Sequence, residues 1–159
     1  MGTRILSDDV IRIARYGSLN WHPGILPDYR GVHVELFALY NHDFSKVGYT
    51  IHYLDSGVDS GDIVWQAAVP VERDDDVYTL RAKSAMSTAR VLPELFAEIE
   101  AGRSLRRPQT GPGRQYRMRD VVPEVQISVI LQCLLRRYRL LGLPQPLAKQ
   151  RPTHMSAST

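Results

Sequence analysis

The protein is a chain of 159 residues, 43% hydrophobic and 23% charged, a composition that suits one globular domain with a substantial core. Its one cysteine, Cys133, excludes an intrachain disulfide and a cysteine-based metal cage, and we expect a reducing, cytoplasmic setting. No stretch reaches the roughly 18 to 20 apolar residues of a membrane-spanning helix, and residues 1–6 hold no apolar run of signal-peptide length.

The charge is distributed unevenly along the chain. Residues 1–101 carry 9 Lys and Arg against 15 Asp and Glu, whereas residues 102–159 carry 11 against 2. The last third is therefore a basic extension of an acidic domain. Such an extension could bind nucleic acid, anionic lipid or a phosphorylated substrate, or it could be a solvated tail, and the sequence leaves these alternatives open.

The first part of the chain predicts two helices separated by a strand and a loop. Ser7 and two aspartates precede an apolar run, which is typical of the N-cap and first turn of a short helix ending near residue 15. A strand over residues 18–21 and a loop rich in proline and glycine over residues 22–31 follow. The apolar spacing over residues 32–41 predicts a helix that is buried on one side.

The middle of the chain predicts two further strands and a long helix. Residues 47–53 form the second strand, residues 54–61 a loop, and residues 63–71 a mostly apolar third strand that we expect to be well covered. Asp74, Asp75 and Asp76 precede a helix over residues 77–100, in which Pro93 predicts a kink or a break. The apolar residues of this helix that fit helical spacing are Leu80, Met86, Leu92, Leu95, Phe96 and Ile99.

The remaining residues predict one more helix. Residues 103–120 are rich in Arg, Pro and Gly and look irregular, with a short extended piece around residues 115–118. Residues 123–141 form a last helix, which packs on the domain, pairs with a second copy or lies on a membrane. Its predicted apolar stripe consists of Ile127, Ile130, Leu134 and Leu141. Residues 143–159 have the composition of a disordered tail.

Asn20 and His22 are the first residues whose spacing indicates chemistry. If residues 18–22 are extended, both side chains leave the same face of the strand. Pro23 bars a helix at this point and favours an extended backbone at His22. An amide beside an imidazole, with a carboxylate nearby, suits the stabilisation of a carbonyl oxygen that gains negative charge. The alternative is that both side chains satisfy loop carbonyls at a strand end.

Two motifs carry a family resemblance. The first is Asn20-x-His22-Pro23 followed by Leu26-Pro27-x-Tyr29-Arg30-Gly31, and the second is Gly48-x-Thr50-Ile51-His52-x-Leu54-Asp55-x-Gly57-x-Asp59-x-Gly61-Asp62-Ile63. In order and spacing the chain, over roughly residues 3–102, resembles the formyltransferases that use 10-formyltetrahydrofolate and the related deformylases. The resemblance implies an α/β fold: the C-terminal half of a Rossmann-like formyltransferase sheet with flanking helices, plus a basic C-terminal helical extension.

The resemblance also implies the roles of individual residues. The family's catalytic Asn, His and Asp fall on Asn20, His22 and Asp59, and a supporting histidine falls on His52. The loop that holds the pterin of the formyl donor falls on Leu54, Asp55, Ser56, Gly57, Val58 and Asp59. The resemblance implies no metal, although His22, His52, Asp55 and Asp59 are ligand types that zinc accepts. Without the resemblance, Asp59 could simply cap a glycine turn and His52 could be a core histidine.

Family members begin with a front half that this chain lacks, some 60 to 100 residues at about 30 per strand–helix unit. We therefore divide the chain into a partial catalytic domain over residues 1–102, a basic extension over residues 103–142 and a tail over residues 143–159. The missing segment, or a second copy of the chain, is an expected partner. Three strands alone would leave a sheet edge or face open.

The expected function is transfer of a formyl group from 10-formyltetrahydrofolate to a small-molecule amine, such as an amino sugar or a nucleotide-linked amine. The residues after Gly102 carry no alternating strand pattern of an appended barrel, which disfavours tRNA as the acceptor. Two alternatives remain open. One is hydrolysis of the same donor by the same three residues, and the other is an inactive truncated remnant of the family.

Overall fold

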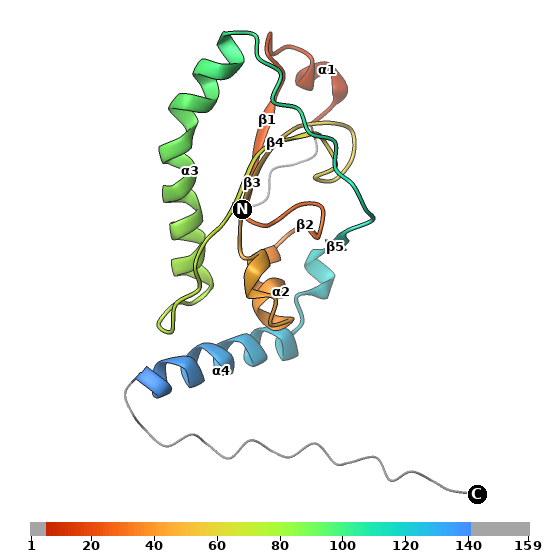
Figure 1. Cartoon of the computed structure of the whole chain (residues 1–159). Helices are drawn as coiled ribbons and strands as arrows, with labels where there is room; N and C mark the ends of the chain where they lie inside the picture. The colour runs from red at the N-terminus through yellow and green to blue at the C-terminus, as the bar shows by residue number, and fades with distance from the viewer. Residues whose placement is uncertain (1–5, 141–159) are drawn as a thin grey trace, which may run out of the picture.

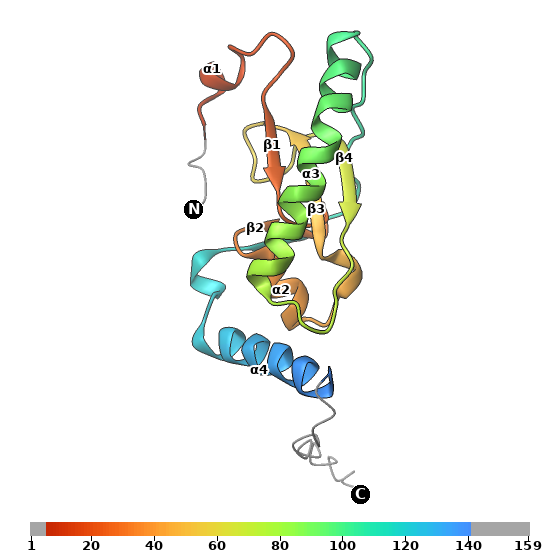
Figure 2. The same cartoon turned by 90° about the vertical axis from the view of Figure 1, so that its left-hand side faces the viewer.

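The computed structural model describes residues 6–140 and is built around a small antiparallel sheet. Its strands are β1 (Leu19–His22), β3 (Gly48–Tyr53) and β4 (Ile63–Ala68), with β3 in the centre. The helix α3 (Val77–Glu100) runs along one side of the sheet, and after it the chain returns down the opposite side of the molecule (Figure 1). Figure 2 shows the same helix lying across the three strands. The predicted strands and their α/β context are confirmed.

The register of the sheet brings the two motifs together. In the antiparallel pair of β1 and β3, Asn20 lies opposite His52 and His22 lies opposite Thr50. Residues that face each other across an antiparallel pair project from the same side of the sheet. The amide and both imidazoles therefore leave one face, and the pairing of β3 with β4 shifts register at Ile51 and His52.

The helix α2 (Val34–Tyr40) is more deeply enclosed than its pattern predicted. Six consecutive residues, Val34, Glu35, Leu36, Phe37, Ala38 and Leu39, are buried. The prediction of a helix buried on one side is wrong because α2 contacts α3 on one flank and α4 on another. The buried carboxylate of Glu35 is paired with Arg81 of α3, which offsets part of the cost of its burial.

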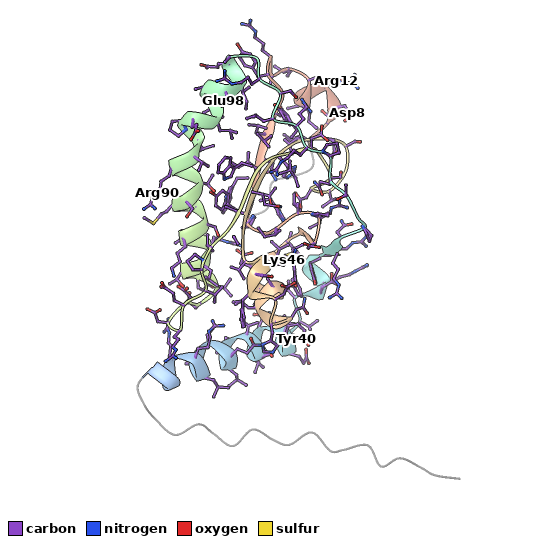
Figure 3. The ribbon with its side chains drawn as sticks, viewed as in Figure 1. Asp8, Arg12, Tyr40, Lys46, Arg90 and Glu98 are labelled. Carbon is purple, nitrogen blue, oxygen red and sulfur yellow. The ribbon has the colours of Figure 1, made fainter. Side chains whose placement is uncertain are left out.

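The long helix α3 begins and ends at the predicted residues. Asp76 caps it by accepting hydrogen bonds from the amides of Tyr78 and Thr79, each at 2.9 Å. The predicted break at Pro93 does not occur, since the helix continues through it to Glu100. In Figure 3, Arg90 projects from α3 away from the sheet.

The predicted apolar face of α3 is confirmed at Leu80, Leu92, Leu95 and Ile99, which are buried or pack against the core, and is wrong at Met86 and Phe96. Leu80, Ser84, Thr88 and Leu95 are buried, whereas Met86 and Phe96 are exposed. Small polar side chains pack here because the helix lies close to the sheet, and the hydroxyl of Ser84 donates to the carbonyl of Gly48 at 3.3 Å. A pattern of large apolar residues alone misses such positions.

A second sheet joins distant parts of the chain. The predicted loop over residues 22–31 ends in a short strand, β2 (Tyr29–Gly31), which pairs in parallel with β5 (Arg114–Tyr116). The expected irregular stretch after α3 thus contains the predicted extended piece, shifted by one or two residues. An isolated bridge between Ile63 and Arg107 adds a further link. Both pairings join a residue before position 102 to a residue after it, so the backbone is hydrogen-bonded across the predicted domain boundary.

The last described helix, α4 (Pro123–Leu140), packs against α2 through a stripe that the sequence did not indicate. Val125, Val129 and Cys133 are buried. Ile127, Ile130 and Leu134, the predicted stripe, are exposed. The prediction of the packing face is wrong because α4 carries apolar residues on more than one side, so that periodicity alone could not choose between them.

The shorter elements complete the fold. The first helix, α1 (Asp8–Ile11), is shorter than predicted, and two 3₁₀ turns span Phe44–Lys46 and Met118–Asp120. The strand β4 is well covered only at its first two residues, since it lies at one edge of the sheet within the described residues. Leu141 and residues 143–159, for which a stripe position and a disordered tail were predicted, lie outside the described part. No helix within residues 6–140 is long and apolar enough to cross a bilayer.

Candidate active site

Asn20 and His52 are in contact across the sheet. The side-chain amide of Asn20 lies 3.1 Å from Nε2 of His52. The other ring nitrogen, Nδ1, lies 2.9 Å from the carbonyl oxygen of Tyr53, which can only accept. In the neutral ring Nδ1 therefore carries the hydrogen, and Nε2 accepts from the amide of Asn20. The second N–H of that amide is not used by this contact.

His22 ends the strand β1 and is held at both ring nitrogens. It is buried, with 2% of its surface exposed. Nε2 lies 2.7 Å from the carbonyl oxygen of Tyr29 and must donate to it, and Nδ1 lies 3.4 Å from Oδ2 of Asp59. A ring proton taken up by His22 would therefore reside on Nδ1, directly beside the carboxylate.

Asp59 stands between the two imidazoles. Its Oδ1 lies 3.5 Å from Nε2 of His52, while its Oδ2 faces His22 and accepts a hydrogen bond of 2.8 Å from the amide of Gly31. The residue adopts a left-handed backbone, with φ of 50°, which is uncommon outside glycine but tolerated best by Asn and Asp. The structure thus brings Asn20, His22, His52 and Asp59 into one cluster.

Burial and nearby charges shift the pKa values of these groups in opposite directions. Burial lowers the pKa of His22 below 6.5, and the nearby carboxylate of Asp59 opposes this shift without cancelling it. Burial raises the pKa of Asp59, but the neighbouring imidazoles of His52 and His22 and the amide of Gly31 outweigh it, so that the pKa falls below 3.8. At neutral pH the cluster therefore holds a carboxylate beside a neutral His22 ring.

Two backbone contacts fix the turn that follows His22. The hydroxyl of Thr50 donates to the carbonyl of Gly24 at 2.7 Å and accepts from the amide of Leu26 at 3.2 Å. Gly31 has φ of 95°, and a Cβ there would meet the carbonyl oxygen of Tyr116 at 2.0 Å. Gly31 therefore allows β2 to approach β5 while its amide points at Asp59.

The loop from Leu54 to Asp59 is held by its own side chains. Asp55 accepts from the amide of Gly57 at 3.0 Å and from the hydroxyl of Ser60 at 2.8 Å. A Cβ on Gly57 would lie 2.0 Å from that hydroxyl, so a larger residue at this position would displace the Ser60 side chain from Asp55. Ser56 is exposed and Val58 half-buried, which leaves the loop accessible from outside.

The residues considered for zinc do not all converge. His22, His52 and Asp59 lie together, but Asp55 is engaged in the loop turn. Among the described residues, a cluster of Glu72, Asp74 and Asp75 also has metal-ligand spacing. The ammonium group of Lys83 lies 2.8 Å from Glu72 and from Asp75 and neutralises charge there.

Three groups that contact the residues of the cluster were not predicted from side-chain type. The carbonyl of Tyr29 and the amide of Gly31 act through the backbone, and Gln109 donates to the carbonyls of Asp59 and Gly61 from fifty residues away. Backbone groups are the same in almost every residue, so a motif of side chains does not reveal their contacts. The Tyr29-Arg30-Gly31 motif was the one available signal that this turn matters.

A cavity of about 720 Å³ lies beyond the same turn, against Asp28, Asn41 and Arg114. None of Asn20, His22 and Asp59 lines it. The cluster therefore lies on the face of the sheet, outside this cavity.

Known proteins resemble this chain over the region that contains the cluster. The family model described as formyl transferase matches residues 3–96. A methionyl-tRNA formyltransferase of Caldanaerobacter subterraneus subsp. tengcongensis is 33% identical over 100 residues, covering 63% of this chain and 32% of that protein. The trifunctional purine biosynthetic protein adenosine-3 of Drosophila melanogaster is 37% identical over 106 residues, covering 67% of this chain and 8% of that protein.

A solved structure shares the fold over a larger part of the chain. It is the formyltransferase PseJ from Anoxybacillus kamchatkensis, in complex with UDP-4,6-dideoxy-4-formamido-L-AltNAc and tetrahydrofolate. The TM-score is 0.68 at 23% identity, and the match covers 82% of this chain and 71% of that chain. The chain spans about a third of the length of the methionyl-tRNA formyltransferases that it matches.

Proposed function

Since the chain belongs to the formyl transferase family, we propose that it transfers a formyl group from 10-formyltetrahydrofolate to a small-molecule amine through Asn20, His22 and Asp59. One observation carries the proposal. Side chains from β1, β3 and the loop after β3 converge into one hydrogen-bonded cluster of amide, imidazole and carboxylate. Such a cluster supplies a donor for a developing oxyanion and a carrier for a proton.

Asn20 is the donor in this proposal. When bound, 10-formyltetrahydrofolate supplies a carbonyl carbon that an amine can attack, with negative charge developing on the carbonyl oxygen. The amide of Asn20 uses one N–H toward His52, and its other N–H is oriented by that same contact. A donor that is fixed before the reaction needs no reorganisation as charge develops. His52 is thus a supporting residue, held in turn by the carbonyl of Tyr53.

His22 and Asp59 handle the proton. The attacking amine must lose a proton, and the departing folate nitrogen must gain one. His22 is neutral near pH 7, with its free lone pair on Nδ1, because Nε2 donates to Tyr29. Nδ1 accepts the proton and later releases it, while the carboxylate of Asp59 at 3.4 Å stabilises the transient imidazolium. No covalent bond to the protein is required.

The loop from Leu54 to Asp59 is the proposed folate site. Its turn is preformed by Asp55, Gly57 and Ser60, so the main chain can meet a flat heterocycle without reordering. The pterin would lie next to Asp59 and therefore within reach of the cluster. Tetrahydrofolate is present in the PseJ complex, which supports a folate donor here.

A small-molecule amine is the proposed acceptor. The names of the two sequence relatives point to different acceptors, one a tRNA and the other a purine precursor, whereas the PseJ complex holds a nucleotide-linked sugar. The fold match to that complex covers 82% of this chain, which supports a small acceptor.

The test is a transfer assay with the full chain, 10-formyltetrahydrofolate and three acceptors: a nucleotide-linked amino sugar, glycinamide ribonucleotide and methionyl-tRNA. We expect formylation of a small amine. Asn20→Ala should lower kcat by about 10²–10³, and His22→Ala by about 10²–10⁴. Asp59→Ala should act in the same direction, and the dissociation constant for the folate should stay within a few-fold in all three variants.

The controls separate this function from its rivals. His42→Asn removes an exposed histidine outside the cluster, at a left-handed position that Asn tolerates, and should leave kcat within about twofold, as surface substitutions usually do. Formate release that does not depend on an amine would instead indicate hydrolysis. Formylation of methionyl-tRNA alone would overturn the acceptor class, and absence of both transfer and formate release would overturn the enzymatic proposal.

A further inference from the structure

Gln109 makes contacts that its position in the sequence does not suggest. It follows α3 by nine residues, beyond the part of the chain that matches the family model. Its Nε2 donates to the carbonyl of Asp59 and to the carbonyl of Gly61, both at 2.8 Å. Its Oε1 accepts from Nη2 of Arg30 at 2.8 Å. One side chain therefore joins the Asp59 loop to the turn that follows His22.

The chemistry of these contacts fixes the orientation of the carboxamide. Two carbonyl oxygens on one side require two donors, and a guanidinium on the other side requires an acceptor. A flipped amide would place oxygen against both carbonyls and N–H groups against Arg30. Gln109 satisfies all three partners in one orientation only, so the observed arrangement is self-consistent.

The backbone around Gln109 is anchored on both sides. Arg107 exchanges two hydrogen bonds with Ile63, at 2.8 and 2.9 Å, directly after the Asp59 loop ends. Further along, the amide of Arg114 donates to the carbonyl of Asp28 at 2.9 Å, where β5 starts to pair with β2. The side chain of Gln109 is half-buried between these anchors and has little freedom to leave the loop.

Gln109 contacts a residue whose backbone lies in the left-handed region. Asp59 is held at φ of 50°, and a left-handed non-glycine residue is strained and persists only when its surroundings hold it. Gln109 binds the carbonyl of this same residue. The carboxylate can then reach Nδ1 of His22 and the amide of Gly31 at the same time.

From this geometry we infer that Gln109 is a positioning residue, which holds the loop of Asp59 so that the carboxylate stays against His22. The inference rests on the proposed function for its catalytic consequence, but the positioning itself does not require turnover. Gln109 touches neither the reacting atoms nor the imidazoles. It acts through Asp59.

The experiment compares two variants of Gln109 in the full chain. Gln109→Ala removes every contact, whereas Gln109→Glu keeps the size and the acceptor for Arg30 but loses both donors when ionised. In the transfer assay both should lower kcat by about 10- to 100-fold, because small misplacements of a catalytic group have effects of this size. KM for the folate should change by less than about threefold, and the circular dichroism spectrum and thermal unfolding of both variants should match the wild type, because partial unfolding would also lower the apparent kcat without changing KM.

A second measurement does not depend on activity. The Cε1–H resonance of His22 is titrated by NMR in the wild type, in both Gln109 variants and in Asp59→Asn. Gln109→Ala and Gln109→Glu should shift the His22 titration in the same direction as Asp59→Asn and should weaken hydrogen-exchange protection of the Gly31 amide. Gln115→Ala, the same residue type on exposed β5, is the matched control and should change neither readout.

The outcomes separate the two proposals. If the wild type is inactive but the His22 titration moves as stated, the positioning stands and the proposed function fails. If both Gln109 variants keep wild-type turnover, titration and amide protection, the positioning is wrong. Loss of turnover in Gln109→Ala with full retention in Gln109→Glu would also overturn it, since the Arg30 contact rather than the two donors would then be responsible.

Discussion

At the scale of residues, the cluster works through the assignment of protons. The carbonyl of Tyr29 fixes a hydrogen on Nε2 of His22, and the carbonyl of Tyr53 fixes one on Nδ1 of His52. The unprotonated nitrogens of the two neutral rings are therefore opposite ones: Nε2 of His52 accepts from Asn20, and Nδ1 of His22 faces the carboxylate of Asp59, which attracts a proton to it. Backbone carbonyls of β2 and β3 thus decide which atom of each histidine is available.

Titration of His22 tests this arrangement. Burial lowers its pKa below 6.5 and Asp59 opposes the shift, so Asp59→Asn should lower the pKa further. The NMR titration of the Cε1–H resonance measures both values. Asp62→Asn removes a carboxylate three residues after Asp59, which lies 3.5 Å from Arg106. This variant should leave the pKa of His22 nearly unchanged. Titration of the wild type above 6.5 would contradict the burial argument.

The same shift has a consequence for stability. The pKa of His22 is near 6.5 in the unfolded chain and lower in the folded chain, so the unfolded chain binds the proton more readily. The neutral ring therefore stabilises the fold above pH 6.5. This contribution is lost as the pH falls from 6.5 through the lower folded pKa. Between pH 7 and pH 5 the free energy of unfolding of the wild type should fall. His22→Ala should show a weaker dependence over that window in urea titrations.

At the scale of elements, the start of α3 is fixed by local hydrogen bonds. The long helix α3 starts where Asp76 accepts from two amides, and the hydroxyl of Thr79 reciprocates by accepting from the amide of Asp76 at 2.8 Å. This reciprocal cap fixes the start of the helix and hence the phase of its buried face. Pro93, seventeen residues later, leaves the helix continuous.

Removal of the cap should destabilise the protein measurably. Asp76→Ala should lower the free energy of unfolding by roughly 0.5–2 kcal/mol. Asp76→Asn keeps the acceptor oxygen and should retain most of that stability. Both variants remove the charge that lies 3.5 Å from Arg137, so their difference in urea denaturation isolates the cap. Equal destabilisation by the two variants would assign the effect to the ion pair instead.

At the scale of the whole molecule, α2 connects the C-terminal helix to the rest of the domain. It lies against α3 and α4, and its aromatic residue Phe37 stacks on Tyr116 of β5 with ring centroids 4.0 Å apart. The last helix joins this core through Val125, Val129 and Cys133. The C-terminal part is therefore attached to the same core that supports the cluster.

Two neighbouring residues of α4 test the attachment. Val129 is 2% exposed and Ile130 is 57% exposed. Val129→Asp would bury an unpaired carboxylate and should lower the melting temperature by many degrees. Ile130→Asp should change the free energy of unfolding by no more than about 0.5 kcal/mol. Thermal unfolding of both variants makes the comparison, and the reverse order would mean that the other face of α4 packs on the core.

The sequence alone determined most of the elements and indicated the candidate site. Local spacing predicted α3 to the residue and placed β1 and β3 within a residue, because helix caps, proline and alternation act over a few residues. It also identified Asn20, His22, His52 and Asp59 as one set, since the two motifs have a fixed order and spacing. The roles of these four residues in catalysis stay predictions.

Tertiary structure decided what local patterns leave open. The packing face of α4 was mispredicted and that of α3 only partly predicted, because burial depends on which neighbour a face meets and Ser84 can be buried while Met86 is not. The pairing of β2 with β5 and the contacts of Gln109 join residues some fifty to eighty-five positions apart. Such contacts form only when the chain folds back on itself, so they decide how firmly the cluster is held and cannot be deduced from spacing along the chain.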